Sequence, residues 1–201
     1  MKSILPCVLL LITLTAISHC RAPAPSPLWD LVFTTNFTQH DTANTIMEGI
    51  WYYDYTAIRQ RTDRNSGRYD SMHCKSLDSY CVTLVDDKYT WVYWPELKKC
   101  CSLCSVSDGC GIIKYDWLKN STFEGYEYVN GYESAKWFIQ GNQKNYYWNT
   151  KRATPYRAMV EMQAVDPGNF KMTFHPKTYN TNPIDPKVFA LPSYCNANVQ
   201  C

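Results

Sequence analysis

Four of the ten cysteines of this 201-residue chain lie within eleven positions, between Cys100 and Cys110. Cys100 and Cys101 are adjacent, and side chains of neighbouring residues on an extended backbone point to opposite faces. We therefore expect each of them to pair with a different part of the molecule. Gly109 and Gly111 flank Cys110 and permit the sharp reversal that a cross-link at this point requires. The cluster predicts a cross-linked fold and says little about chemistry.

The Cys101-x2-Cys104 spacing is also typical of a zinc site, so the compartment decides between zinc and disulfides. Lys2, the apolar run Ile4–Ile17 and the small residues after it are typical of a secretory signal peptide, which we place at residues 1–20. Cleavage there leaves eight cysteines, and an oxidising route favours disulfides. The cysteines predicted to form them are Cys74, Cys81, Cys100, Cys101, Cys104, Cys110, Cys195 and Cys201.

The remaining chain has the size of one domain. Residues 21–27 contain three prolines and predict an extended leader, and residues 28–201 are long enough to bury one core. Asn180–Pro192 is a proline-rich stretch, which we expect Cys195 or Cys201 to tie to the body. The predicted organisation is a signal peptide, a leader and a single β-rich domain with a disulfide-tied tail.

Charge and hydropathy exclude several classes of partner. The chain has 20 basic and 18 acidic residues. This near balance argues against a nucleic-acid partner, because binding a nucleic acid requires a basic face. No second apolar segment is long enough to span a membrane, so a stable membrane span is not expected. The signal peptide predicts a secreted protein. The sequence does not determine the oligomeric state, and a dimer is compatible with it.

Alternation of apolar and polar residues predicts about ten strands with no long helical period. Asn130-Gly131 is the strongest hairpin turn, and Asp166–Asn169 is a second turn by composition. The predicted fold class is therefore all-β: an antiparallel two-sheet sandwich or open barrel, cross-linked by disulfides. The expected strands are residues 28–37, 46–55, 81–85, 88–94, 112–118, 123–129, 135–140, 146–150, 155–164 and 170–174, and residues 59–71 are expected to form a polar hairpin region.

Signals of catalysis are weak. The histidines after the signal peptide are His40, His73 and His175, and none lies in a nucleophile-elbow, zincin or papain-type context. A carboxylate pair for glycoside chemistry would have to come from Glu124, Glu127, Glu133 and Glu161, which are equally expected on a solvated sheet face. These patterns favour a protein that binds without catalysing a reaction.

No cofactor and no metal site is expected. Asp86-Asp87 and the turn Asp166–Asn169 offer oxygens that could bind calcium, although such turns usually bind nothing. Calcium is therefore the one candidate cofactor.

Several strands carry aromatic residues on both faces, among 16 Tyr, 7 Trp and 7 Phe. One sheet of a sandwich buries one face, so the other needs a cover: a neighbouring segment, a partner protein or an apolar ligand held by a curved sheet. We predict an apolar or lipid-like ligand, with a carbohydrate-binding or glycoside-active protein and a structural extracellular component as alternatives. The predicted pocket residues are Trp91, Tyr93, Trp137, Ile139, Tyr146, Trp148, Met159 and Phe174.

Two sequons predict a glycoprotein. Asn36-Phe37-Thr38 and Asn120-Ser121-Thr122 both match the acceptor pattern for N-linked glycans, and both lie in polar, turn-like surroundings. We expect glycans at Asn36 and Asn120, and at Asn120 above all.

Several motifs together resemble a family of small secreted eukaryotic proteins, rich in cysteine and of unassigned function. They are Tyr80-Cys81, Cys100-Cys101-x2-Cys104-x5-Cys110-Gly111, Lys114-x-Asp116-Trp117-Leu118, Phe123-x-Gly125 and Val188–Cys195. From about Tyr89 to Cys195 the order of motifs more remotely resembles that of ependymin-related proteins. Three motifs carry this resemblance: Lys99-Cys100, the sequon before Phe123-Glu124 and the ending Asp185–Cys195. Cys101, Cys104 and Cys110 depart from that pattern.

The resemblance implies a LolA-like pair of curved antiparallel sheets that enclose an apolar pocket. It also implies a glycosylated protein of the lysosome or the extracellular space, with lipid binding and calcium-linked behaviour. The disulfide scheme stays open, because eight cysteines allow 105 pairings.

Overall fold

The computed structural model describes residues 26–40, 46–68, 70, 73–151, 158–165 and 170–201, so the predicted signal peptide and most of the leader lie outside the described residues. It contains strands and short 3-10 helices η1 to η5. The strands are β1 (Val32–His40), β2 (Ile46–Asp54), β3 (Arg59–Arg64), β4 (Cys81–Val85), β5 (Tyr89–Trp94), β6 (Lys99–Ser105), β7 (Thr122–Val129), β8 (Tyr132–Gln140), β9 (Lys144–Thr150), β10 (Met159–Ala164) and β11 (Phe170–Phe174). The 3-10 helices are η1 (Tyr55–Ala57), η2 (Pro95–Leu97), η3 (Val106–Asp108), η4 (Pro176–Thr178) and η5 (Pro186–Phe189).

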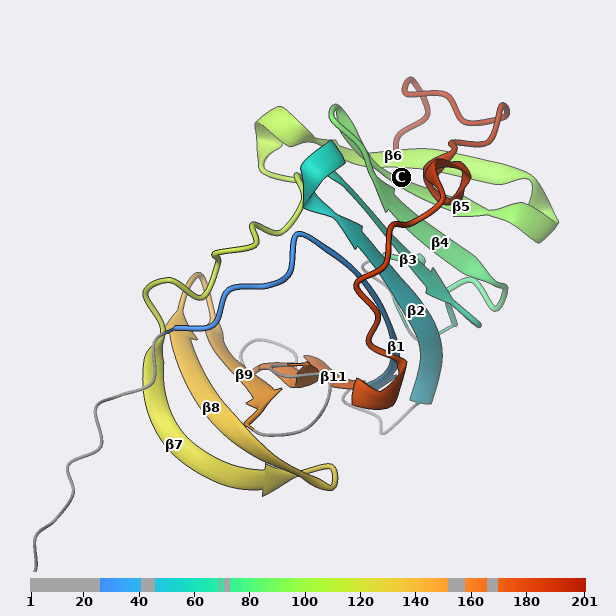
Figure 1. Ribbon diagram of the computed structural model, residues 1–201. Helices are drawn as coiled ribbons and strands as arrows, with labels where there is room; N and C mark the ends of the chain where they lie inside the picture. The colour runs from blue at the N-terminus through green and yellow to red at the C-terminus, as the bar shows by residue number, and fades with distance from the viewer. Residues whose placement is uncertain (1–25, 41–45, 69, 71–72, 152–157, 166–169) are drawn as a thin grey trace, which may run out of the picture.

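All eleven strands belong to one antiparallel sheet, in the order β6-β5-β4-β3-β2-β1-β11-β10-β9-β8-β7. The sheet curls strongly, so that β7, β8 and β9 come round to one side of β1 to β6 (Figure 1). Register shifts in the β7–β11 half, at residues 159–161 and 123–125, are typical of the bulges that bend strands. The predicted all-β, antiparallel, disulfide-bonded fold is confirmed, and its strands form a single curved sheet.

Most hairpins follow from their turns. β4 and β5 have almost the predicted bounds, and Asp86 forms the turn between them by accepting the backbone N–H groups of Lys88 and Tyr89. Asn130-Gly131 links β7 to β8 with both residues at positive φ, as the favoured hairpin turn requires.

Within the predicted polar hairpin region, residues 59–71, the structure places a central strand of the sheet, β3, at residues 59–64. Its charged residues are tolerated there because they are paired: Arg59 with Asp54 at 2.7 Å and Arg61 with Asp63 at 2.5 Å. Pairing removes the main penalty for burying charge, which the composition of the segment could not reveal.

Three cysteines of the cluster, Cys100, Cys101 and Cys104, lie on the edge strand β6, and Cys110 follows η3. Cys100 and Cys101 point to opposite faces of the sheet, as predicted, and bond Cys195 and Cys201 in the tail. The other two disulfides are local, Cys74–Cys81 and Cys104–Cys110. All eight of these cysteines are therefore in disulfides, and both Cys195 and Cys201 tie the tail to the body.

The two faces of the sheet have separate covers. On β4 and β5 the outer face carries an outer cluster, Val82, Leu84, Trp91, Tyr93 and Phe189, covered by the tail that ends in Cys201. The inner face of the curl carries a larger cluster, described below. No helix within the described residues is long and apolar enough to cross a membrane.

Candidate ligand-binding site

The inner face of the curl is lined by aromatic and methionine side chains from strands far apart in sequence. Strand register aligns Phe33 with Tyr53, Phe37 with Phe174, and Trp137 with Tyr147. The twelve buried residues that we call the inner cluster are Trp29, Phe33, Phe37, Trp51, Tyr53, Leu118, Ala135, Trp137, Tyr147, Met159, Met172 and Phe174.

Two irregular segments cover the inner cluster. One is the chain before β1, where the backbone N–H of Trp29 donates to the carbonyl oxygen of Tyr115 at 2.9 Å. The other is the crossover, residues 110–121, which runs from β6 to β7 between the two sides of the curl (Figure 1). The crossover contributes Leu118 to the inner cluster, and four further apolar side chains pack against it: Ile112, Ile113, Tyr115 and Trp117. No second sheet performs this role in the described part of the chain.

The crossover corrects the expectation of a strand at residues 112–118. These residues form turns and irregular chain, and the strand of this part of the sequence is β6, which lies earlier, at Lys99–Ser105. The aromatic residues that suggested a strand are buried here by packing against the inner cluster and not by pairing with a neighbouring strand.

Trp29 is the centre of the cluster. Its ring lies 5.4 Å from Trp51 and 5.6 Å from Tyr53 and from Trp117, each in an edge-to-face arrangement. Edge-to-face pairs match the positive edge of one ring to the negative face of the other. Trp29 thereby joins β2 on one side to the crossover on the other.

Tyrosine hydroxyls anchor the cover. Tyr53 donates to the carbonyl oxygen of Ile113 at 2.8 Å, and Tyr179 donates to Asp30 at 2.7 Å. Burial raises the pKa of Tyr53 well above its usual range, with Asp116 adding to the effect. Burial also raises the pKa of Tyr147 and Tyr179, with Asp30 adding to both. These hydroxyls therefore stay protonated and uncharged at any physiological pH.

Some buried polar atoms of this region lack a partner. Among the described residues, five buried side-chain polar atoms make no hydrogen bond, and four belong to the inner cluster or the crossover. They are the indole nitrogens of Trp29, Trp51 and Trp117 and the hydroxyl of Ser121; the fifth is the indole nitrogen of Trp94. Trp29 interacts with the Tyr147 hydroxyl and lowers its pKa slightly against burial, but without the geometry of a hydrogen bond.

Four of the eight predicted pocket residues lie at the inner cluster. Trp137, Met159 and Phe174 are members, and Ile139 packs against it. They come from β8, β10 and β11, which the curl of the sheet brings together.

The other four lie elsewhere, which corrects the expectation that all eight share one face. Trp91 and Tyr93 belong to the outer cluster beneath the tail, where burial raises the pKa of Tyr93 to about 12. Tyr146 and Trp148 lie on the outer face of β9, because β9 places Tyr147 opposite Trp137. Alternation groups residues within one strand, but only the register between strands decides which group faces inward.

The sequence analysis missed Trp29, Phe33, Trp51, Tyr53, Trp117 and Tyr147 as site residues. The hairpin turn at Asn130-Gly131 fixed the register of β7 against β8 but not of β8 against β9. Trp29 and Trp117 fall within the predicted strands 28–37 and 112–118, but the structure places both outside regular strands, so alternation did not predict where their rings lie.

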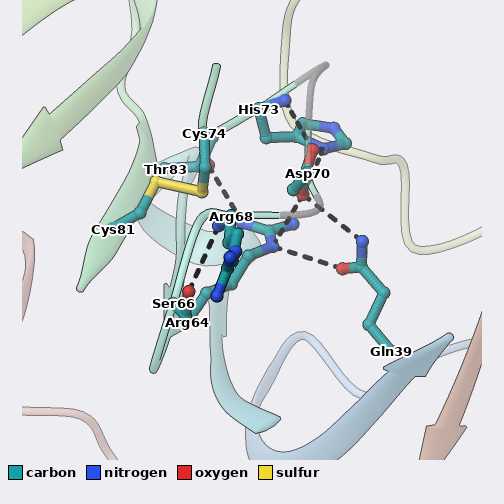
Figure 2. The surroundings of a disulfide bond; sticks show 9 residues. All are labelled: Gln39, Arg64, Ser66, Arg68, Asp70, His73, Cys74, Cys81 and Thr83. Atoms are coloured by element: carbon teal, nitrogen blue, oxygen red, sulfur yellow. Dashed lines mark hydrogen bonds and ion pairs between the residues drawn. A yellow bond between two sulfur atoms is a disulfide. The ribbon is translucent and has the colours of Figure 1, made fainter. Parts of the chain in front are cut away.

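A buried polar network lies on the inner face of the sheet, beside the Cys74–Cys81 disulfide (Figure 2). Arg64 lies 3.0 Å from the Asp70 carboxylate and donates to Gln39 at 3.2 Å and to Thr83 at 3.1 Å. Burial alone would raise the pKa of Asp70, but His73 and Arg64 outweigh it and hold that pKa well below its usual range. The network is internally neutralised and holds the segment before β4 against β3.

Two turns are candidates for calcium binding, Asp86-Asp87 and Asp166–Asn169. No group of three or more metal-binding side chains occurs within the described residues. The Asp86 carboxylate is engaged by the N–H groups of Lys88, Tyr89 and Trp91, and the Asp166–Asn169 turn lies outside the described residues. The calcium hypothesis stays a prediction.

Both sequon asparagines are exposed, Asn36 on the outer face of β1 and Asn120 in the crossover just before β7. Their exposure is compatible with glycans, and the modification itself stays a prediction.

No family model matches this sequence, and no curated protein does. Among solved structures, an uncharacterised conserved protein from Thermus thermophilus is similar, with a TM-score of 0.56 and 8% identity over 86% of this chain and 91% of that one. At this identity the match shows the fold alone.

Two further solved structures match with lower scores. MucB in complex with MucA has a TM-score of 0.42 and 9% identity over 83% of this chain and 56% of that one. A LolA superfamily protein from Nitrosomonas europaea has a TM-score of 0.39 and 8% identity over 82% of this chain and 92% of that one. The resemblance to ependymin-related proteins stays a prediction.

Proposed function

We propose that this protein binds an apolar or amphipathic, lipid-like ligand at the inner cluster, between the curved sheet and its irregular cover. The observation that carries the proposal is the cover itself. A face lined by aromatic residues from both sides of the curl is closed by Trp29 and the crossover, with no second sheet among the described residues. A cover of irregular chain exchanges more easily with a ligand than a packed layer does, because fewer ordered contacts have to break.

The carbohydrate alternative has less support. Sugar binding by stacking needs an exposed aromatic face. Tyr128 on β7 is exposed, but Lys151 lies over Tyr126, and on β9 Trp148 is 6% exposed and Lys136 lies over both Trp148 and Tyr146. The candidate carboxylates are engaged on the sheet: Glu124 by Lys136, Glu127 by Trp148, and Glu161 by Asn130 and Lys171. A non-catalytic binding role fits these contacts better.

The compartment fits the same proposal. Four disulfides in the structure indicate an oxidising environment. A secreted or lysosomal glycoprotein would carry its ligand in the extracellular space or the lysosomal lumen.

The test compares two tryptophans on adjacent strands. Trp137 faces the inner cluster and donates to Asn149, whereas Trp148 faces outward and donates to Glu127, and both are buried. We expect wild-type protein to bind a fluorescent apolar probe such as N-phenyl-1-naphthylamine. Trp137→Ala should weaken that binding about tenfold, equal to about 1.4 kcal/mol, and Trp148→Ala should leave it within about twofold.

Urea unfolding of the same variants completes the test. If Trp137 only fills a dry core, its removal costs about 3–5 kcal/mol and leaves probe binding unchanged. That result, or a wild-type protein that binds no apolar probe, contradicts the proposal. A mass spectrum of the native protein that shows copurified lipid supports it, whereas an empty protein retained on glycan arrays supports the carbohydrate alternative.

A further inference from the structure

The unpartnered polar atoms of the structure are concentrated at one place. Trp51 is 3% exposed, its ring contacts Trp29 at 5.4 Å and Phe174 at 5.9 Å, and its indole N–H has no acceptor among the described residues. Trp117, on the crossover, also lacks an acceptor in the described part of the chain, and its ring contacts Trp29 at 5.6 Å. The two donors therefore lie on the sheet and on the cover, with the Trp29 ring in contact with both.

Such a concentration needs a physical reason. More than nine in ten buried polar groups in folded proteins have a hydrogen-bond partner, because an unpaired buried donor loses its bond to water without compensation. The tryptophans outside the inner cluster and its cover mostly obey this rule. Trp91 donates to Asp86 and Trp148 to Glu127, and within the cluster Trp137 donates to Asn149. The donors of Trp51 and Trp117 are thus exceptions at the site where a ligand would lie.

The charges around the inner cluster define the acceptor further. Asp30 accepts a hydrogen bond from the Tyr179 hydroxyl at 2.7 Å, and Asp116 lies on the crossover directly before Trp117. Asp116 adds to the rise in the pKa of Tyr53, and Asp30 adds to that of Tyr147, after the larger effect of burial. Arg64, a cation on the same face, is neutralised by Asp70 at 3.0 Å. An anionic ligand head group would therefore meet acidic neighbours, whereas an uncharged oxygen meets donors.

We propose, building on the function proposed above, that Trp51 and Trp117 donate hydrogen bonds to an uncharged oxygen acceptor of the ligand, such as a carboxylic ester carbonyl. The ligand class is then a neutral oxygenated lipid. A pure hydrocarbon would leave both donors unpaired, and an ionised fatty acid would place its charge beside Asp30 and Asp116.

The first experiment observes the donors directly by nuclear magnetic resonance of the seven indole N–H groups. Three probes with chains of equal length, methyl oleate, 1-octadecene and sodium oleate, are delivered from a cyclodextrin carrier at pH 7.5. Methyl oleate should move the indole signals of Trp51 and Trp117 downfield, as a new hydrogen bond does. The signals of Trp94, Trp91 and Trp148 serve as internal controls and should stay in place, because Trp94 is unpartnered in another cluster and the others are already bonded.

The second experiment removes only the donor. Replacing Trp51 by β-(3-benzothienyl)alanine keeps the shape of the side chain and exchanges the N–H for sulfur. We expect the variant to bind methyl oleate about three- to tenfold more weakly, the effect of one ordinary hydrogen bond, and to bind 1-octadecene as wild type does. The same replacement at Trp148 is the matched control and should leave the affinity for both probes unchanged.

The outcomes separate this inference from the proposed function. If methyl oleate and 1-octadecene bind equally and the Trp51 signal does not move, the protein binds apolar ligands but the donors do not select them, and the inference is overturned. Exchange signals between water and the Trp51 and Trp117 N–H groups that persist with methyl oleate bound would also overturn it, because buried water would then be the partner. Tighter binding of sodium oleate overturns the neutral-ligand assignment. If no probe binds at all, the proposed function itself fails.

Discussion

At the scale of single residues, Arg64 and Asp70 form a buried ion pair with their guanidinium and carboxylate groups 3.0 Å apart. Both side chains are nearly inaccessible, at 4% and 3% exposure. Removing one partner of a buried pair leaves the other charge uncompensated, which typically costs about 3–5 kcal/mol. Gln39, Thr83 and His73 satisfy the remaining donors and acceptors, so the network stabilises the loop only while it is complete.

Asp70→Asn should therefore lower the free energy of unfolding by about 3–5 kcal/mol at pH 7. The pKa of Asp70 is lower in the folded chain than in the unfolded chain, where it is about 4. The ionised carboxylate therefore stabilises the fold fully above about pH 4, and this stabilisation is lost as the pH falls through the pKa of the folded state. The difference between wild type and variant should accordingly be the same at pH 7 and pH 5 and smaller at pH 3. Urea unfolding at the three pH values measures this.

Asp78→Asn is the control, because the side chains of Asp78 and Arg68 are 63% and 59% exposed. An exposed pair contributes little, so this variant should stay within about 0.5 kcal/mol of wild type at each pH. Equal effects of the two substitutions would show that the buried network does not stabilise the fold.

At the scale of elements, β6 shows how the chain protects an exposed sheet edge. The backbone N–H of Ser102 donates to the carbonyl oxygen of Val199 at 2.8 Å, and the N–H of Cys201 donates to the carbonyl oxygen of Ser102 at 3.0 Å. The end of the tail thus occupies the edge that another chain could pair with, and the Cys101–Cys201 disulfide holds it there.

Replacing Cys101 and Cys201 together by Ser should have two effects. Loss of a cross-link that closes a loop of 100 residues should cost about 4–5 kcal/mol, whereas the same change at Cys104 and Cys110, six residues apart, should cost about 2–3 kcal/mol. The first variant should also self-associate through the freed β6 edge. Urea unfolding and light scattering after size exclusion measure the two effects; equal stability losses and a monomeric first variant would contradict the role given to the tail.

At the scale of the whole molecule, the two predicted glycosylation sites lie differently with respect to the proposed ligand site: Asn36 is on the opposite face of the sheet, and Asn120 is in the crossover that covers the inner cluster. Asn36 is exposed on the outer face of β1, on the strand that carries Phe33 and Phe37 inward. Asn120 is exposed just beyond Leu118, the residue of the crossover that is fully buried in the inner cluster.

We expect glycans at these asparagines, at Asn120 above all, in protein from its native source. Enzymatic deglycosylation should lower the mass and convert each modified asparagine to aspartate, which peptide mass spectrometry locates. Because Asn36 faces away from the inner cluster, Asn36→Gln should leave binding of the apolar probe unchanged. An unaltered mass after deglycosylation contradicts the glycan prediction without affecting the proposed ligand site.

The sequence by itself determined the local features of this protein. Alternation located the strands 81–85 and 170–174 with their observed bounds, and Asn130-Gly131 located the β7–β8 turn. The adjacency of Cys100 and Cys101 determined that they bond different partners. These features depend on side-chain direction and turn geometry, which neighbouring residues set within a single strand or hairpin.

Only the tertiary structure decided which aromatic residues meet. Trp137 and Trp148 have the same chemistry on adjacent strands, yet the β8–β9 register directs one into the inner cluster and the other away from it. β3 is a strand because Arg59 and Arg61 find carboxylate partners, and Trp29 joins the core from outside any strand. Strand register and the path of the crossover are contacts between distant parts of the chain, and their free energies exist only once the sheet has curled.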